Sequence, residues 1–119
     1  MNAKKKGSEG ERELLEILRA HGIEAHRNDQ RYIGGHENPD VAARIRGFDL
    51  HLEVKRREKL SAYEAIAQAE RDCGHALPVV MYRKNRAEWL AIMPLTVFFE
   101  LMEVGAGHAD TLEKGSPEC

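Results

Sequence analysis

The sequence HENPDVAARIRGFDLHLEVKRR, residues 36–57, contains the clearest strand pattern in the chain. Its second half, residues 48–55, alternates apolar side chains with polar or charged ones. A period of two is typical of a β-strand whose two faces differ. Residues 40–45 form a second strand candidate that begins directly after Pro39, where a proline is tolerated. Gly47 marks a tight turn between the two strands. The stretch therefore predicts a β-hairpin.

This hairpin is expected to bring two carboxylates together. Asp40 lies seven residues before Gly47 and Glu53 lies six residues after it, so the acids should face each other within one residue of register. Glu53, Lys55 and His51 alternate with apolar neighbours and therefore share one face of their strand. Convergent carboxylates repel each other unless a cation lies between them, and hard oxygen ligands suit Mg²⁺ or Mn²⁺. The pattern is consistent with metal-assisted phosphodiester hydrolysis in which Lys55 orients the attacking water or stabilises transition-state charge.

The same spacing has a second interpretation. Alternating acids and bases on an edge hairpin are often the solvated face of a half-buried sheet, with weak cross-strand pairs. From spacing alone this interpretation is slightly favoured. His51 is likewise expected to be a solvated sheet histidine rather than a ligand or a base.

A helix is predicted to precede the hairpin. Ser8 and Glu11 have the S-x-x-E spacing of a capping box, apolar residues follow at helical spacing, and Gly22 is a natural stop. The helix is therefore expected to begin at Ser8. Glu11 has a structural interpretation here, because it can close the capping box.

The remaining elements complete an α/β pattern. Ser61 is the predicted N-cap of a helix over residues 62–73. The apolar stripe of that helix is expected to consist of Ala62, Ile66, Ala69 and Cys73. The other predicted elements are strands at 23–28, 78–83 and 89–94 and a helix at 95–104. The fold class is a mixed β-sheet flanked by helices, in the order α-β-β-β-α-β-β-α.

The composition is that of one soluble domain. The chain has 119 residues, 42% hydrophobic and 32% charged, and contains no apolar run long enough to span a bilayer. No secretory signal is expected, and two cysteines make neither a disulfide framework nor a zinc site. The expected location is the cytoplasm. Residues 1–104 are predicted to form the domain, and residues 105–119, rich in Gly, Ser, Asp, Glu and Pro, a disordered tail.

Charge is distributed unevenly along the chain. The net charge is −2, but residues 1–86 hold 17 of the 18 Lys and Arg residues. Basic clusters lie at 4–6, 44–46, 55–59 and 83–86, and clusters of this kind can form a stripe for a phosphate backbone. Solvated surface charge is an equally good interpretation of the clusters alone.

Two motifs carry a resemblance to a known family. Pro39-Asp40 followed by Glu53-Val54-Lys55 resembles the signature of the PD-(D/E)XK nucleases, the restriction-endonuclease-like superfamily. KKGSEGERELLEILRAHGIEAHR, residues 5–27, resembles the opening of the archaeal-type Holliday junction resolvases, which phages also encode. The matching positions there are Lys6-Gly7-Ser8, Glu11-Arg12 and Gly22. The resemblance runs from about residue 5 to residue 102.

The resemblance implies a catalytic site. It assigns Asp40 and Glu53, with the Val54 carbonyl, to a Mg²⁺ ion that Mn²⁺ can replace, and it adds Glu11 as a catalytic glutamate beside that metal. Lys55 matches the catalytic lysine, and Gln68 lies where related nucleases have a supporting glutamine. The family implies products with a 5′-phosphate and a 3′-hydroxyl.

The resemblance also implies partners. Arg12 matches a basic residue that meets the DNA backbone, and further DNA contacts are expected from Lys4, Lys5, Lys6, Arg31, Arg56 and Arg57. Each of these has an ordinary surface interpretation. The apolar segment 89–102 exceeds what one small strand and helix require. Ordinary core packing is one interpretation of it, and a homodimer surface as in the resolvases is the favoured one.

One loop departs from the family pattern. Residues 28–38 replace the short Ser/Gly-rich stretch usual in the resolvases, which affects the expected junction specificity more than the chemistry. His36 and Tyr32 in this loop are weak candidates for DNA contacts. The leading hypothesis is a Mg²⁺-dependent Holliday junction resolvase. The alternatives are a phage-type nuclease for flaps, nicks or single strands, a DNA-binding module that does not cut, and a plain interaction domain.

Overall fold

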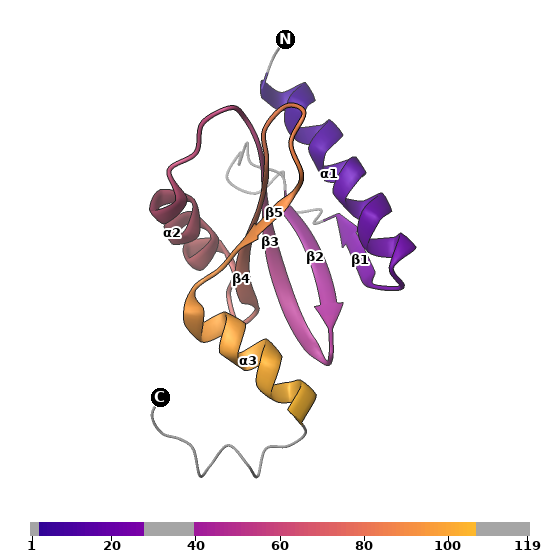
Figure 1. The fold of residues 1–119 in the computed structure, drawn as a ribbon, viewed down its shortest axis with the longest axis vertical. Coiled ribbons are helices and arrows are strands. Elements are labelled where there is room, and N and C mark those ends of the chain that lie inside the picture. Colours follow the sequence, from indigo (N-terminus) through magenta and orange to yellow (C-terminus); the bar gives the residue numbers. More distant parts are fainter. Residues whose placement is uncertain (1–2, 28–39, 107–119) are drawn as a thin grey trace.

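The computed structural model describes residues 3–27 and 40–106, and within these the side chains of residues 9–27 and 41–103. The order of helices and strands agrees with the sequence prediction (Figure 1). The elements are α1 (Ala3–Ala20), β1 (Glu24–Arg27), β2 (Asp40–Ile45), β3 (Phe48–Arg56), α2 (Ala62–Asp72), β4 (Leu77–Arg83), β5 (Leu90–Ile92) and α3 (Leu95–Ala106).

The strands form one mixed sheet in the order β1-β2-β3-β4-β5. Neighbouring strands are antiparallel except for β3 and β4, which are parallel and are joined through α2. Figure 1 shows α1 and α2 on opposite sides of this sheet. A helix that connects two parallel strands runs back antiparallel to both of them, and α2 packs over both β3 and β4.

The larger core lies between α1 and the sheet. Leu14, Leu15 and Leu18 of α1 are buried against Leu52 and Val54 of β3, and α3 contributes Val97 to the same cluster. A smaller cluster on the other face joins α2 to β4. The two clusters alternate along β4, where Val79 belongs to the first and Val80 to the second. The prediction of a central strand covered on both faces is confirmed.

The β2–β3 hairpin has the predicted register. Asp40 is the partner of Glu53, and Ile45 is the partner of Phe48. The two residues of the turn, Arg46 and Gly47, both have left-handed backbones, with φ of 55° and 86°. Such a two-residue turn matches the twist of the flanking strands. The turn thereby holds the two acidic positions directly opposite each other.

One sequence prediction about the helices is wrong and another is confirmed only in part. Helix α1 begins at Ala3 rather than at Ser8, because Ala3 and the three lysines that follow are good helix formers and extend the helix. Helix α2 buries Ala65 and Ala69, so the expected stripe is confirmed at Ala69 and at the half-buried Ile66, whereas Ala62 is exposed and Ala65 takes its place. Alanines occur around this helix, so packing against Val80 decides which of them face the sheet.

Two predicted segments lie largely outside the described residues. These are the polar loop, of which residues 28–39 are not described, and the C-terminal tail, of which residues 107–119 are not described. Helix α3 continues to Ala106, two residues into the predicted tail. Within the described part of the chain, no helix is both long enough and apolar enough to cross a membrane.

Candidate active site

Strand β3 carries three ionisable side chains on the face that α2 covers. His51, Glu53 and Lys55 have exposed fractions of 6%, 0% and 4%. Burial of charged groups is costly unless they are paired or hold an ion. The structure therefore contradicts the interpretation of a solvated sheet face, and with it the expectation that His51 is solvated.

Glu53 is the centre of this row. His51 Nε2 donates a 2.9 Å hydrogen bond to Glu53 Oε1, and Lys55 Nζ lies 3.8 Å from Glu53 Oε2. At 3.8 Å the lysine forms an ion pair but no hydrogen bond. Oε2 accepts no hydrogen bond from any residue that the structure describes. A buried carboxylate oxygen with a spare lone pair fits a bound cation.

Helix α2 contributes two polar side chains, Gln68 and Asp72, that lie close to these residues of β3. Lys55 Nζ donates a 2.9 Å hydrogen bond to Gln68 Oε1. Gln68 and Asp72 are four residues apart and so lie on the same side of α2. Because α2 runs antiparallel to β3, Gln68 meets Lys55 near the end of the strand and Asp72 meets His51 nearer its start.

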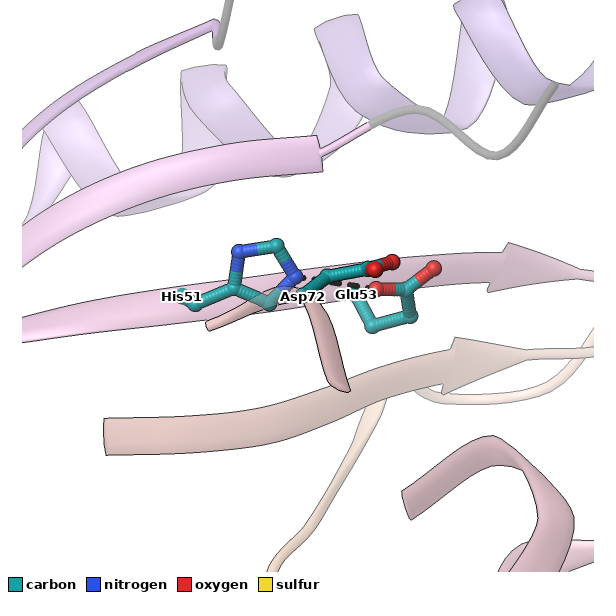
Figure 2. A group of neighbouring side chains, drawn as sticks. All are labelled: His51, Glu53 and Asp72. Carbon is teal, nitrogen blue, oxygen red and sulfur yellow. Dashed lines mark hydrogen bonds and ion pairs between the residues drawn. The ribbon is translucent and has the colours of Figure 1, made fainter. Parts of the chain in front are cut away.

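The side chains of His51, Glu53 and Asp72 form a cluster that can hold a metal ion. Figure 2 shows them turned toward one another beside β3. Each offers one ligand atom, and these atoms all lie within 4.8 Å of one another. Sequence reasoning missed Asp72. The β3–α2–β4 connection was predicted, but the depth at which α2 docks decides which of its residues meets His51.

The sequence-predicted acids occupy two places in the fold. Asp40 is the backbone partner of Glu53, and its side chain lies outside the described part. Glu11, 3% exposed, lies on α1 and accepts a 2.6 Å hydrogen bond from Arg27 Nε at the end of β1. Arg27 is the strand partner of Val41, the residue that follows Asp40. The metal role of Glu11 stays a prediction.

The predicted DNA-binding residues also differ in their surroundings. Arg12 and Arg57 are exposed. Arg56 has a side chain only 14% exposed, and it binds Glu13. Side chains of the remaining predicted contacts, Lys4, Lys5, Lys6 and Arg31, lie outside the described part, as do those of Tyr32 and His36.

A hollow of about 550 Å³ opens beside the metal-binding cluster. It is lined by residues of β1, β2 and β3 and by the end of α2, including His51 and Asp72. Solvent ions can therefore approach the buried end of the cluster. Cys73 also lines this hollow, and burial, assisted by Glu70 and Asp72, raises the pKa of its thiol. Cys73 is thus kept in the neutral form, which is a poor metal ligand.

The fold and the site define a class. A mixed sheet carrying Asp40 opposite Glu53, with Lys55 on the Glu53 face, is the arrangement of a PD-(D/E)XK nuclease. The family model described as archaeal Holliday junction resolvase (hjc) matches residues 2–98, and the chain belongs to this family.

One solved structure supports the assignment. Archaeoglobus fulgidus Hjc, a Holliday junction resolvase from an archaeal hyperthermophile, is 30% identical to this chain, with a TM-score of 0.53. The similarity covers 73% of this chain and 76% of that one. No curated protein matches the sequence.

Proposed function

We propose that this chain is a Mg²⁺-dependent endonuclease that hydrolyses phosphodiesters in four-way DNA junctions, and that Mn²⁺ can replace Mg²⁺. Membership of the resolvase family supports the reaction and the branched substrate. The observation that carries the metal dependence is Glu53. This carboxylate is fully buried, yet one of its oxygens accepts no hydrogen bond from the described residues.

The proposed ligands are Asp40, Glu53, the Val54 carbonyl and Glu11. The register supports the first two, because it places the Asp40 and Glu53 backbones directly opposite each other. Oxygen ligands of this kind are the ones Mg²⁺ prefers. A bound Mg²⁺ would polarise the phosphodiester and lower the pKa of a water molecule.

Lys55 is the proposed electrostatic catalyst. Its ammonium is buried between Gln68 and Glu53, at 2.9 Å and 3.8 Å. A cation held from two sides has few alternative positions, and in a buried site its charge is screened weakly by water. Lys55 can therefore stabilise negative charge on the reacting phosphate without reorganising. Gln68 is the residue that orients it.

His51 is proposed to orient Glu53 rather than to bind Mg²⁺. Its hydrogen bond to Oε1 restrains the carboxylate while Oε2 remains available. A histidine nitrogen suits Mn²⁺, Co²⁺ or Zn²⁺ better than Mg²⁺. The cluster with Asp72 is therefore a second possible ion position that shares Glu53 with the first.

A homodimer is proposed through β5 and α3. Large apolar side chains are exposed there, which is unfavourable in an isolated domain. They are Leu90, Leu95, Phe98, Phe99 and Met102. A dimer would cover them and would present two active sites to the junction. Arg12, Arg31, Arg57 and the lysines at 4–6 are the proposed contacts to its phosphates.

The test is cleavage of a labelled four-way junction beside a flap and a linear duplex of the same sequence. Each substrate is incubated with Mg²⁺, with Mn²⁺ and with EDTA. Paired cuts in the junction that require a metal ion are the expected result. Comparable cutting of the flap would indicate a phage-type nuclease and contradict a junction-specific resolvase. Junction binding without any cutting would favour a binding module.

A further inference from the structure

The turn between β4 and β5, residues 84–89, is anchored by polar contacts to the end of β3. The backbone N–H of Asn85 donates to Glu58 Oε2 at 2.8 Å, and Arg56 Nη2 donates to Asn85 Oδ1 at 3.3 Å. Arg83 Nε donates to the Ala87 carbonyl at 2.7 Å. An exposed turn is usually mobile, and contacts of this number restrict it.

These anchors are themselves fixed by α1. The carboxylate of Glu13 accepts hydrogen bonds from Arg56 at 3.2 Å and from Arg83 at 2.6 Å. Gly10, one turn earlier on α1, packs so closely that a Cβ there would lie 2.5 Å from Arg56 Cγ. These contacts restrict the side chain of Arg56. Because Arg56 also binds Asn85, the position of the turn depends on where α1 packs.

The anchored turn presents two exposed cations, Lys84 and Arg86. Arg86 adopts a left-handed backbone, with φ of 60°. This conformation is unfavourable for most residues, and among non-glycine residues asparagine and aspartate tolerate it best. Non-glycine residues held there occur often at functional sites. The turn also contains one acid, Glu88, at its β5 end.

The turn lies at the catalytic end of the sheet. Tyr82 is the partner of Lys55, so Lys84 is two residues beyond the row of the catalytic lysine, about 7 Å along the strand. Projected on the axis of a DNA duplex, about 7 Å is the rise of about two base-pair steps. The turn and the segment that leaves β3 extend from the same end of the sheet, near the start of α1 (Figure 1). Arg57 is exposed in that segment.

We propose that the β4–β5 turn is a preorganised platform for the DNA backbone, in which Lys84 and Arg86 contact phosphates next to the one that is cut. Arg56 is then a positioning residue, since it is mostly buried and holds Asn85 from within. This inference rests on the proposed function, because it takes the bound polymer to be junction DNA. Phosphate contacts of this kind fix the register of the duplex without reading its bases.

The hairpin turn at the other end of the sheet supplies a matched control. Arg46 is also an exposed arginine with a left-handed backbone, with φ of 55°, but it lies in the β2–β3 turn, away from the catalytic row. Asparagine tolerates this conformation, so Arg86→Asn and Arg46→Asn each remove one charge with little strain. The two variants differ in the end of the sheet that they alter.

The experiment measures binding of a fluorescent four-way junction in EDTA, over a series of salt concentrations. Arg86→Asn is expected to weaken binding several-fold and to lower the slope of log affinity against log salt by about one, as for one lost phosphate contact. Arg46→Asn is expected to match the wild type in both quantities. Equal slopes for the two variants would overturn the platform, even if the junction were still cut.

The positioning role of Arg56 is tested by a double-mutant cycle. Arg56→Met retains an unbranched side chain of similar length but cannot bind Asn85 or Glu13. It is expected to weaken junction binding, and Arg86→Asn should add little in its presence, because the turn is already released. Additive losses would overturn the positioning role. Hydrogen exchange at the Asn85 and Ala87 amides gives an independent measure, expected to rise in Arg56→Met.

Failure of the inference and failure of the proposed function are distinguishable. A wild-type protein that cuts the junction, together with identical binding by Arg86→Asn and Arg46→Asn, would overturn the platform alone. A lower salt dependence of binding in Arg86→Asn but not in Arg46→Asn, together with no metal-dependent cutting by the wild type, would support the platform and contradict the proposed nuclease activity. A wild-type protein that binds no DNA would overturn both.

Discussion

Lys55 on β3 donates a 2.9 Å hydrogen bond to Gln68 on α2 and forms a 3.8 Å ion pair with the buried carboxylate of Glu53. The lysine of the Glu-Val-Lys motif is therefore positioned by two different elements. Any role of Lys55 in the reaction depends on the docking of α2 as well as on the strand that carries it.

Gln68→Ala is expected to lower kcat by about tenfold and to leave KM nearly unchanged, since groups that orient a catalytic residue act mainly on the chemical step. Steady-state cleavage over a series of junction concentrations measures kcat and KM. Glu64→Ala, an exposed change one turn earlier on α2, is the control and should behave as wild type. Equal kcat values for the two variants would show that Gln68 does not support the catalytic site.

Asp40→Asn and Glu53→Gln are each expected to abolish cleavage in Mg²⁺ while junction binding in EDTA persists, because binding depends chiefly on basic residues. The amides keep the size of the carboxylates but lose the charge that holds the metal. Cleavage and binding are measured on the same preparations, with thermal unfolding as a check of the fold. Wild-type cutting by either variant would show that the metal assignment is wrong.

Zn²⁺ is expected to inhibit Mg²⁺-supported cleavage by occupying the His51–Glu53–Asp72 cluster, since it accepts nitrogen and oxygen ligands together. Asp72→Asn should raise the Zn²⁺ concentration needed for inhibition by about tenfold. Cleavage is measured over a Zn²⁺ series at constant Mg²⁺. Equal inhibition of the wild type and the variant would place Zn²⁺ elsewhere.

Gly10→Ala is expected to destabilise the fold by about 1 kcal/mol, although alanine is the better helix former. The added methyl group would lie 2.5 Å from Arg56 Cγ, which is near the backbone and restrained by Glu13. Urea unfolding measures the loss. In an Arg56→Ala background the same change should be neutral or stabilising, and an unchanged penalty there would refute the proposed contact.

Phe98→Ser combined with Phe99→Ser is expected to convert a dimer into a monomer, because it removes two exposed aromatic rings from the proposed interface. Light scattering after gel filtration measures the molar mass. Tyr63→Ser removes an exposed aromatic ring from α2 instead and should leave the mass unchanged. A wild-type monomer would show that β5 and α3 do not form the interface.

Much of this fold was predictable from local pattern. The alternation over residues 48–55 identified β3, and the almost equal distances from Gly47 predicted that Asp40 faces Glu53, as observed. These features depend on neighbouring residues and on a two-residue turn. The start of α1 was mispredicted because a capping box marks a possible helix start but does not prevent good helix formers from extending the helix.

The order of the elements, the hairpin register and the family follow from the amino-acid sequence alone, because each depends on spacing along the chain. The burial of His51, Glu53 and Lys55, and the contacts of this face with Gln68 and Asp72, are evident only in the folded molecule. Alternation separates the faces of a strand but does not say what covers them. Burial depends on where α2 docks, and packing between distant segments determines that position.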